Sequence, residues 1–170
     1  MVSIEQVVYV VPLLALAASL FYNALNLRTA NKNQKMQLET RQAQLFINIY
    51  NQTLNNQPTR DAHKIMSTWK WSSFEELSET LFVSEESEKN MDALLLIGAF
   101  YNGVGILVKE NLLDIRYVDT MTCWITMFWE LLDPYIDELR AKTYPKLFNE
   151  TEYLYKELMK YRKEHPEPTP

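Results

Sequence analysis

Three carboxylates at helical spacing are the side chains best placed for chemistry. Glu130, Asp133 and Asp137 stand at positions i, i+3 and i+7, on one face of a predicted helix. Neighbouring carboxylates can bind a hard cation or share a proton. Arg140 follows Asp137 by three residues and can pair with it within the helix. We expect a solvated, ion-paired face, and the alternative is a metal- or ligand-binding enzyme or sensor centred on Glu130 and Asp133.

The other reactive side chains have no partners at useful spacing. Cys123 is the one cysteine, and its apolar segment TMTCWITMFW predicts a buried, inert thiol. His63 has no second histidine at metal-ligand spacing, so a surface or capping role is expected. His165 falls in the polar tail. The sequence therefore predicts no catalytic residue, no metal site and no cofactor.

The segment MDALLLIGAFYNGVGILV, residues 91–108, is apolar on nearly every side and predicts a central buried helix. Its glycines, Gly98, Gly103 and Gly105, indicate close backbone packing, since glycine costs about 1 kcal/mol relative to alanine in a helix. A second membrane span is the alternative, but Lys109 and Glu110 end the apolar run early.

Two further groups of residues have predicted roles at helix ends. Lys109 and Glu130 flank the most apolar helices and are predicted to form a buried polar pair of structural importance. Large aromatic residues near helix junctions belong to the core or to a docking surface. Trp69, Trp71 and Phe74 are therefore candidate interaction residues, provided that Trp71 and Phe74 are exposed together.

The elements that must position these residues begin with a membrane anchor at 6–27. No charge occurs between Glu5 and Arg28, and a helix of about 20 apolar residues crosses a bilayer. A buried core helix and a cleaved signal peptide are the alternatives, but a positive n-region is missing before the apolar run. Basic residues follow the span and none precede it, which places the N-terminus outside and the remainder in the cytoplasm. We expect a single-pass protein of the cell membrane.

Charge is divided unevenly after the span. Residues 28–41 hold one acid, Glu39, and four basic residues that should face lipid headgroups: Arg28, Lys32, Lys35 and Arg41. The residues beyond 41 hold 13 basic and 20 acidic side chains. The net charge of −5 argues against nucleic acid as a partner.

The predicted fold class is all-α. A single transmembrane helix continues into a basic stalk helix at 28–56, and a cytoplasmic bundle of about five helices follows at 60–163, then a disordered tail at 164–170. Ser72 or Ser73 should cap a helix, with Glu75 or Glu76 completing a capping box. Asp114 should cap a later helix.

That later helix has the strongest periodic pattern in the chain. Its apolar residues alternate at spacings of three and four. They are Val118, Met121, Ile125, Phe128, Leu132, Ile136 and Leu139. Pro134 should kink or divide the helix near Leu132, and Pro145 should open the last helix.

Five segments resemble a prokaryotic family catalogued as domain of unknown function 4760. They are RQAQLFINIYNQ, WKW with SFEEL, GAFYNGVGILVKENLLD, FWELLDPYIDELR and FNETEYLYKEL. The resemblance covers about residues 7–162. It implies a small, membrane-anchored, all-helical domain, and it implies no activity and no site residues.

These observations predict a non-enzymatic interaction protein held at the membrane, or an accessory subunit of a membrane complex. Its expected partners are the lipid bilayer and either a protein or a second copy of the chain, through the stalk or the helical domain. A small hydrolase or metal-dependent enzyme at Glu130 and Asp133 is the second hypothesis. A sensor that binds an apolar ligand between its helices is the third.

Overall fold

A computed structural model describes residues 4–166, with side chains from residue 19 onward except those of Leu54 and Thr122. Most side chains of the predicted span 6–27, and residues 167–170 of the predicted tail, thus lie outside the described residues. The described backbone is helical and contains no strand, which confirms the all-α class. It divides into two units, one ending at Arg41 and one beginning at Gln42.

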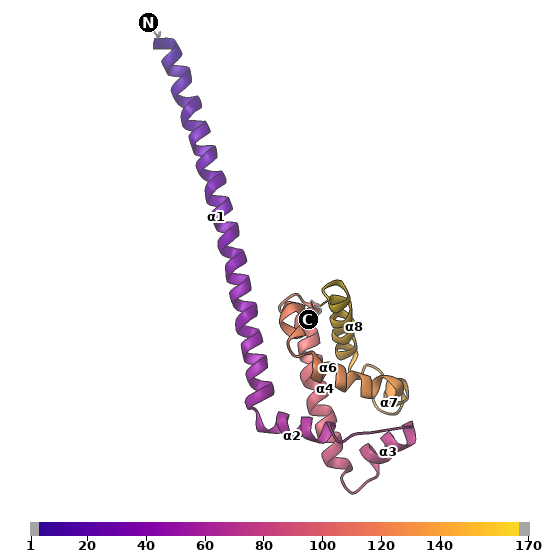
Figure 1. Cartoon of the computed structure of the whole chain (residues 1–170). Helices are drawn as coiled ribbons and strands as arrows, with labels where there is room; N and C mark the ends of the chain where they lie inside the picture. The colour runs from indigo at the N-terminus through magenta and orange to yellow at the C-terminus, as the bar shows by residue number, and fades with distance from the viewer. Residues whose placement is uncertain (1–3, 167–170) are drawn as a thin grey trace. The chain divides into compact units, whose positions relative to one another are not determined.

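The described helices follow one another with short connections (Figure 1). They are α1 (Ile4–Asn55), α2 (Gln57–Met66), α3 (Phe74–Phe82), α4 (Ser87–Lys109), α5 (Ile115–Asp119), α6 (Thr122–Leu132), the 3₁₀ turn η1 (Asp133–Tyr135), α7 (Ile136–Lys142) and α8 (Asn149–Glu164).

The long helix α1 runs without a break, as the absence of Gly and Pro over 28–56 predicts. Its last part belongs to the second unit, because Ile49 and Thr53 are buried there and the ring of Phe46 stacks on Tyr117 at 5.5 Å. The compact unit therefore begins at Gln42, earlier than the expected Arg60. The difference arises because one helix can be exposed along one stretch and packed along the next.

Polar side chains and backbone turns fix the helix ends where the sequence places capping residues. Ser73 caps α3 by accepting from the N–H of Glu76 at 3.4 Å, while the Glu76 carboxylate accepts from the N–H of Ser72 at 2.7 Å. Asp114 caps α5 through the N–H of Arg116 at 2.9 Å. The predicted caps are thus confirmed, and the carboxylate near each first turn also suits the helix dipole.

Helix α4 forms the centre of the second unit and packs against α2, α3 and α8 (Figure 1). Its backbone ends in a left-handed residue, Asn111, at φ 56°. The N–H groups of Asn111 and Leu112 return to the carbonyls of Val108 and Leu107 at 3.0 and 2.8 Å, which is a Schellman motif. Among the described helices, α4 is the one long and apolar enough to cross a membrane, with a mean hydropathy of 1.7, and 44% of that window is buried within the protein.

Close packing on α4 is confirmed at two of its three glycines. A Cβ at Gly98 would collide with the ring of Phe148, and one at Gly105 would collide with the backbone of Glu150. Among the described residues, no atom lies within 4 Å of the Cβ position of Gly103, so the expected packing fails there. Gly98 and Gly105 are seven residues apart and share one side of the helix, which Phe148 and the start of α8 cover, whereas Gly103 lies on another side.

The periodic segment after Asp114 is buried at each of its seven predicted positions, as expected: Val118, Met121, Ile125, Phe128, Leu132, Ile136 and Leu139. It is divided between α5, α6 and α7, and η1 contains Pro134 where the predicted break falls. Pro145 lies four residues before α8 and does not open it. Helix α8 follows Phe148, whose backbone is left-handed (φ 56°).

Candidate functional site

The predicted acidic face does not converge on one point. Glu130 lies in the last turn of α6 and is exposed, and its carboxylate accepts from the Tyr155 hydroxyl at 3.3 Å. Asp133 begins η1, while the Asp137 side chain is 93% exposed and lies 3.9 Å from Arg140. Within the described residues, no three His, Cys, Asp or Glu side chains come close enough to hold a metal ion. The change from α to 3₁₀ geometry at Asp133 breaks the spacing that would have aligned the carboxylates.

The predicted buried pair of Lys109 and Glu130 is wrong. The ammonium of Lys109 lies 3.0 Å from Glu150, an ion pair that joins the end of α4 to the start of α8. The Lys109 side chain is 50% exposed and that of Glu150 is 26% exposed. Lys109 also lies over the Tyr153 ring, 5.7 Å from its centroid. The prediction failed because helix α8 packs on α4 and brings Glu150, in place of Glu130, next to Lys109.

The proposed aromatic docking residues belong mainly to the core. Trp69 is buried and donates from its indole N–H to Asn90 at 2.9 Å. Trp71 stacks on Trp69 with a centroid distance of 5.1 Å and is half-buried. Phe74 packs partly against the core under the ammonium of Lys142, which lies 4.6 Å from its ring centroid. Trp71 and Phe74 therefore do not form an exposed patch.

Cys123 and His63 both have environments opposite to the predicted ones. Cys123 is exposed, although its segment is apolar, because it lies two positions from the buried Ile125 on α6. His63 is buried: its Nδ1 lies 2.8 Å from the Thr59 carbonyl oxygen and its Nε2 lies 2.9 Å from the Tyr101 hydroxyl. Since a carbonyl only accepts, Nδ1 holds the proton and Nε2 accepts from Tyr101. Desolvation lowers the pKa of His63, and the hydrogen bond to Thr59 partly opposes that effect.

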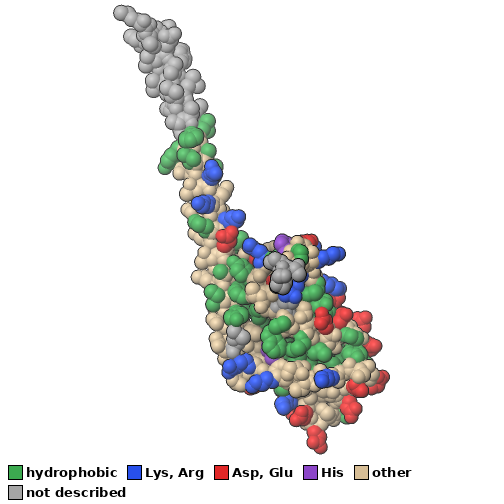
Figure 2. Space-filling view, in the orientation of Figure 1, with side chains coloured by type: hydrophobic (Ala, Val, Ile, Leu, Met, Phe, Trp, Pro, Cys, Tyr) green, Lys and Arg blue, Asp and Glu red, His purple; other side chains and the backbone are tan. Residues whose placement is uncertain are grey.

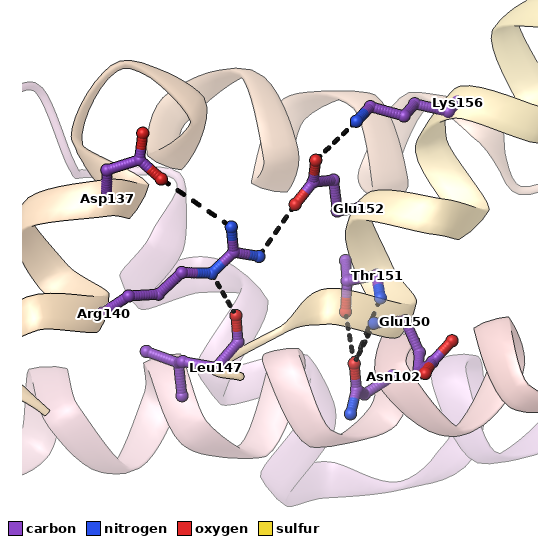
Figure 3. Close-up of polar contacts among 8 residues, drawn as sticks. All are labelled: Asn102, Asp137, Arg140, Leu147, Glu150, Thr151, Glu152 and Lys156. Atoms are coloured by element: carbon purple, nitrogen blue, oxygen red, sulfur yellow. Dashed lines mark hydrogen bonds and ion pairs between the residues drawn. The ribbon is translucent and has the colours of Figure 1, made fainter. Parts of the chain in front are cut away.

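An ionic network joins α7 to the first turn of α8 (Figure 3). The guanidinium of Arg140 donates to the Glu152 carboxylate at 2.8 Å and to the Leu147 carbonyl at 3.0 Å. Lys156 donates to the other oxygen of Glu152 at 2.5 Å. These two cations lower the pKa of Glu152, mainly through the hydrogen bond from Lys156, while burial opposes them. Each cation has a carboxylate or carbonyl partner, so the network holds α8 in place.

A side chain from another helix caps α8. Phe148 precedes α8 and makes no side-chain cap. Instead, the side-chain Oδ1 of Asn102 on α4 accepts from the N–H groups of Glu150 and Thr151 at 3.0 and 3.1 Å (Figure 3). The Thr151 hydroxyl also donates to the Gly98 carbonyl, at 3.4 Å. The sequence contains no signal for this cap, because 48 residues separate the asparagine from the first N–H group that it meets. The polar contacts of Asn102 and Thr151 therefore join α8 to α4.

The feature of the second unit best suited to a partner is the outward side of α4. Its exposed apolar residues form the outer α4 stripe, which we define as Leu95, Leu96, Ala99, Gly103 and Ile106. Next to the start of the stripe, α2 and α4 enclose a groove of about 430 Å³. Its apolar lining includes Ala62, Ile65 and Leu96. Its charged lining consists of one base, Lys89, and five acids: Asp61, Glu85, Glu86, Glu88 and Asp92. Acidic side chains gather over the end of the unit that holds α3 and the start of α4 (Figure 2).

The sequence shows that residues 91–108 are apolar on nearly every side, including the side that forms this stripe. A helix that is apolar on nearly every side is expected to be buried on every side. Only 44% of the apolar window of α4 is buried within the protein. Part of the remainder is half-buried against the core, and the outer α4 stripe is exposed.

The first unit exposes an apolar stretch followed by a basic one. Its large apolar residues between 20 and 27 are 46–68% exposed: Leu20, Phe21, Tyr22, Leu25 and Leu27. The predicted lipid-facing residues come next and are exposed as well: Arg28, Lys32, Lys35 and Arg41. Figure 2 shows this change from apolar to basic side chains along α1.

Comparison with known proteins gives one match, to a protein-family model. No curated protein and no solved structure matches the chain. One family model matches residues 13–158, which include most of α1 and every later helix up to α8. The matched range holds the segments whose resemblance the sequence indicates. The chain belongs to the family described as Domain of unknown function (DUF4760).

Proposed function

We propose that the protein is a non-enzymatic interaction protein, or an accessory subunit of a membrane complex, anchored through the N-terminal part of α1. The observation that supports this most directly is the exposed apolar stretch 20–27 followed at once by exposed Arg28, Lys32 and Lys35. Apolar side chains exposed along a helix gain free energy in lipid, about 25 cal/mol for each Å² removed from water. Basic residues just beyond them favour anionic headgroups by about 1 kcal/mol each.

The second unit supplies the surface for interaction in this proposal. Its polar residues serve internal structure, as the Arg140 and Asn102 contacts illustrate, while its outer α4 stripe leaves apolar surface in water. Contiguous apolar patches on a small domain mark interaction sites. The proposed orientation, with the N-terminus outside and the second unit in the cytoplasm of a cell, follows from the basic residues after the span.

The lone thiol provides a direct test of this arrangement. Cys123 is exposed on α6, so a membrane-impermeant maleimide should react with it once the reagent reaches its side of the membrane. In spheroplasts of the expression host we expect labelling of Cys123 only after permeabilisation, and retention of the chain in membranes washed with carbonate.

A matched variant tests on which side of the membrane the N-terminus lies. A Ser3→Cys, Cys123→Ser double variant should label in intact spheroplasts. Labelling of Cys123 in intact spheroplasts would reverse the orientation, and release of the chain by carbonate would exclude the anchor.

A further inference from the structure

The outer α4 stripe has the shape of a helix-docking surface. Leu95, Leu96 and Ile106 are 46%, 40% and 47% exposed, and the smaller Ala99 and Gly103 lie exposed between them. Ala99 and Gly103 are four residues apart and therefore lie one above the other on the same face. Two small residues with this spacing let another helix backbone approach closely, with larger side chains packing on either side.

Gly103 has no structural explanation within the described part of the chain. Gly98 and Gly105 make room for Phe148 and for the Glu150 backbone, whereas nothing lies within 4 Å of a Cβ at Gly103. Glycine inside a helix costs about 1 kcal/mol relative to alanine, so this position is unfavourable for the isolated unit. A neighbour that approaches from outside would use the space that Gly103 leaves open.

The charges at the ends of the stripe decide what kind of neighbour fits. Glu88 and Asp92 precede the stripe on the same side of α4, and Glu110 follows it. The lining of the α2–α4 groove adds Asp61 and Glu85 near its beginning. Three lysines near these acids form ion pairs: Lys64 with Asp61 at 3.2 Å, Lys89 with Glu86 at 3.9 Å and Lys109 with Glu150 at 3.0 Å. Along the stripe itself, Glu88 and Asp92 at one end and Glu110 at the other leave an apolar middle with an acidic group at each end.

This charge pattern disfavours two of the three possible occupants. A second copy packed along the same stripe would place carboxylates opposite carboxylates, whether the two helices ran parallel or antiparallel. An anionic lipid surface would be repelled by the same groups. A helix with basic residues at both ends would meet an opposite charge at each end.

We infer that the outer α4 stripe, with the acidic groups at its two ends, docks an amphipathic helix of a partner protein whose apolar face ends in Lys or Arg on both sides. Asp92 and Glu110 are 18 residues apart, or about 27 Å at 1.5 Å per residue. The partner helix therefore needs about five turns. This inference gives a surface and a partner class to the interaction function proposed above, and it rests on that function.

The test uses the full chain in nanodiscs of zwitterionic lipid and a synthetic probe helix of 18 residues. The probe has Lys at both ends, a Leu/Ala apolar face and a photoreactive residue at its centre. One control peptide has Glu in place of Lys, and another has the same composition with its apolar residues spread around the helix. Binding is measured by fluorescence anisotropy, with empty nanodiscs as the background.

We expect the Lys-ended probe to bind at least about tenfold more tightly than either control peptide, which corresponds to about 1.4 kcal/mol. Its photo-crosslinks should map between Leu95 and Ile106. Gly103→Leu should weaken probe binding by about tenfold, because the larger side chain fills the crossing point. The same variant should melt no lower than the parent, since the Cβ position is open and leucine favours helix.

Two control variants, one acidic and one apolar, distinguish binding at this surface from nonspecific binding of the probe elsewhere on the protein. Asp92→Asn with Glu110→Gln should weaken binding and reduce its dependence on salt, whereas Glu138→Gln on α7 should leave both unchanged. Tyr144→Ser removes an apolar side chain that is 58% exposed elsewhere and should have no effect.

Three results would overturn the inference. Equal binding of the three peptides, or equal binding to parent and Gly103→Leu, would exclude selective docking on the stripe. Rapid disulfide dimerisation of an Ala99→Cys, Cys123→Ser variant without probe would assign the stripe to a second copy. These readouts do not depend on the anchor, so carbonate release of the chain would refute the proposed membrane function and leave the docking result separate.

Discussion

At the scale of single residues, His63 shows how burial gives an ordinary side chain a definite role. Its ring lies between the Thr59 carbonyl and the Tyr101 hydroxyl, with the Trp124 ring edge-on at a centroid distance of 4.9 Å. Tyr101 is itself buried, which raises the pKa of its hydroxyl and keeps it a donor to Nε2. Both ring nitrogens are satisfied in the neutral form, and protonation would convert Nε2 from an acceptor to a donor facing that hydroxyl.

The helical unit should lose stability when the pH falls below the pKa of histidine in the unfolded chain, which is about 6.5. Desolvation lowers the pKa of His63 in the folded state from 6.5, so the unfolded state binds the proton more readily. Stability is therefore complete above about pH 6.5 and falls between this value and the lower folded pKa, by at most about 1.4 kcal/mol per pH unit. Unfolding monitored by tryptophan fluorescence from pH 8 to 5 measures the slope.

The His63→Gln variant serves as the comparison, because it retains a polar side chain but does not titrate. It should be less stable at pH 8 and should show a flatter dependence between pH 6.5 and 5. The lowered pKa values of Asp61, Asp114 and Glu152 act below this window, since an unfolded carboxylate titrates near 4. An unchanged slope in His63→Gln would contradict the assignment.

Cys123 and Gly103 show the limit of reasoning from residue type. An apolar neighbourhood in the sequence predicted a buried thiol, yet Cys123 lies on the exposed side of α6. The same reasoning predicted close packing at all three glycines, and Gly103 stands in open space. In both cases a single residue's environment depends on its angular position on the helix relative to a neighbour that the sequence does not identify.

At the scale of elements, the helix ends were predictable where the capping group is close in sequence. Ser73 and Asp114 cap the helices that directly follow them, and Pro134 breaks a helix at its own position. The start of α8 was not predictable. Its N–H groups are capped by Asn102, which becomes a neighbour only when α8 packs on α4.

The Asn102 cap leads to a prediction about α8. Asn102→Ala leaves the N–H groups of Glu150 and Thr151 without their acceptor and should destabilise the unit by about 1–3 kcal/mol. Hydrogen exchange at these two amides should accelerate more than exchange in α6.

Two variants make this result specific. Asn102→Asp retains an acceptor next to a helix N-terminus and should recover most of the stability. Asn149→Ala changes an exposed residue at the start of α8 and should alter stability by less than about 0.5 kcal/mol. If Asn102→Ala behaved like Asn149→Ala, the cap would have no energetic importance.

At the scale of the whole molecule, charge is separated along the chain. The first unit after the apolar stretch has four basic residues and one acid, whereas the second unit has 13 basic and 20 acidic residues. An anionic bilayer would attract the first and repel the second. The proposed function uses this division, because a repelled unit keeps its outer α4 stripe free for a protein partner.

Removal of the basic residues nearest the span should weaken the orientation of the molecule. We expect Arg28→Gln, Lys32→Gln and Lys35→Gln together to give a mixed population in which part of the Cys123 becomes accessible in intact spheroplasts. The control removes three exposed lysines of the second unit and should leave the orientation unchanged: Lys146→Gln, Lys160→Gln and Lys163→Gln. Identical labelling of the two triple variants would contradict a role for these basic residues.

The sequence by itself determined the helical elements, the seven buried positions from Val118 to Leu139 and the separation of charge, because these depend on spacings of three or four residues or on composition. Only the tertiary structure decided that Lys109 meets Glu150, that His63 meets Tyr101 and that Gly103 stays uncovered. The physical reason is range. Helical periodicity is set by bonds four residues apart, whereas a polar contact forms within about 3 Å of a partner that helix packing brings from 38 or 41 residues away.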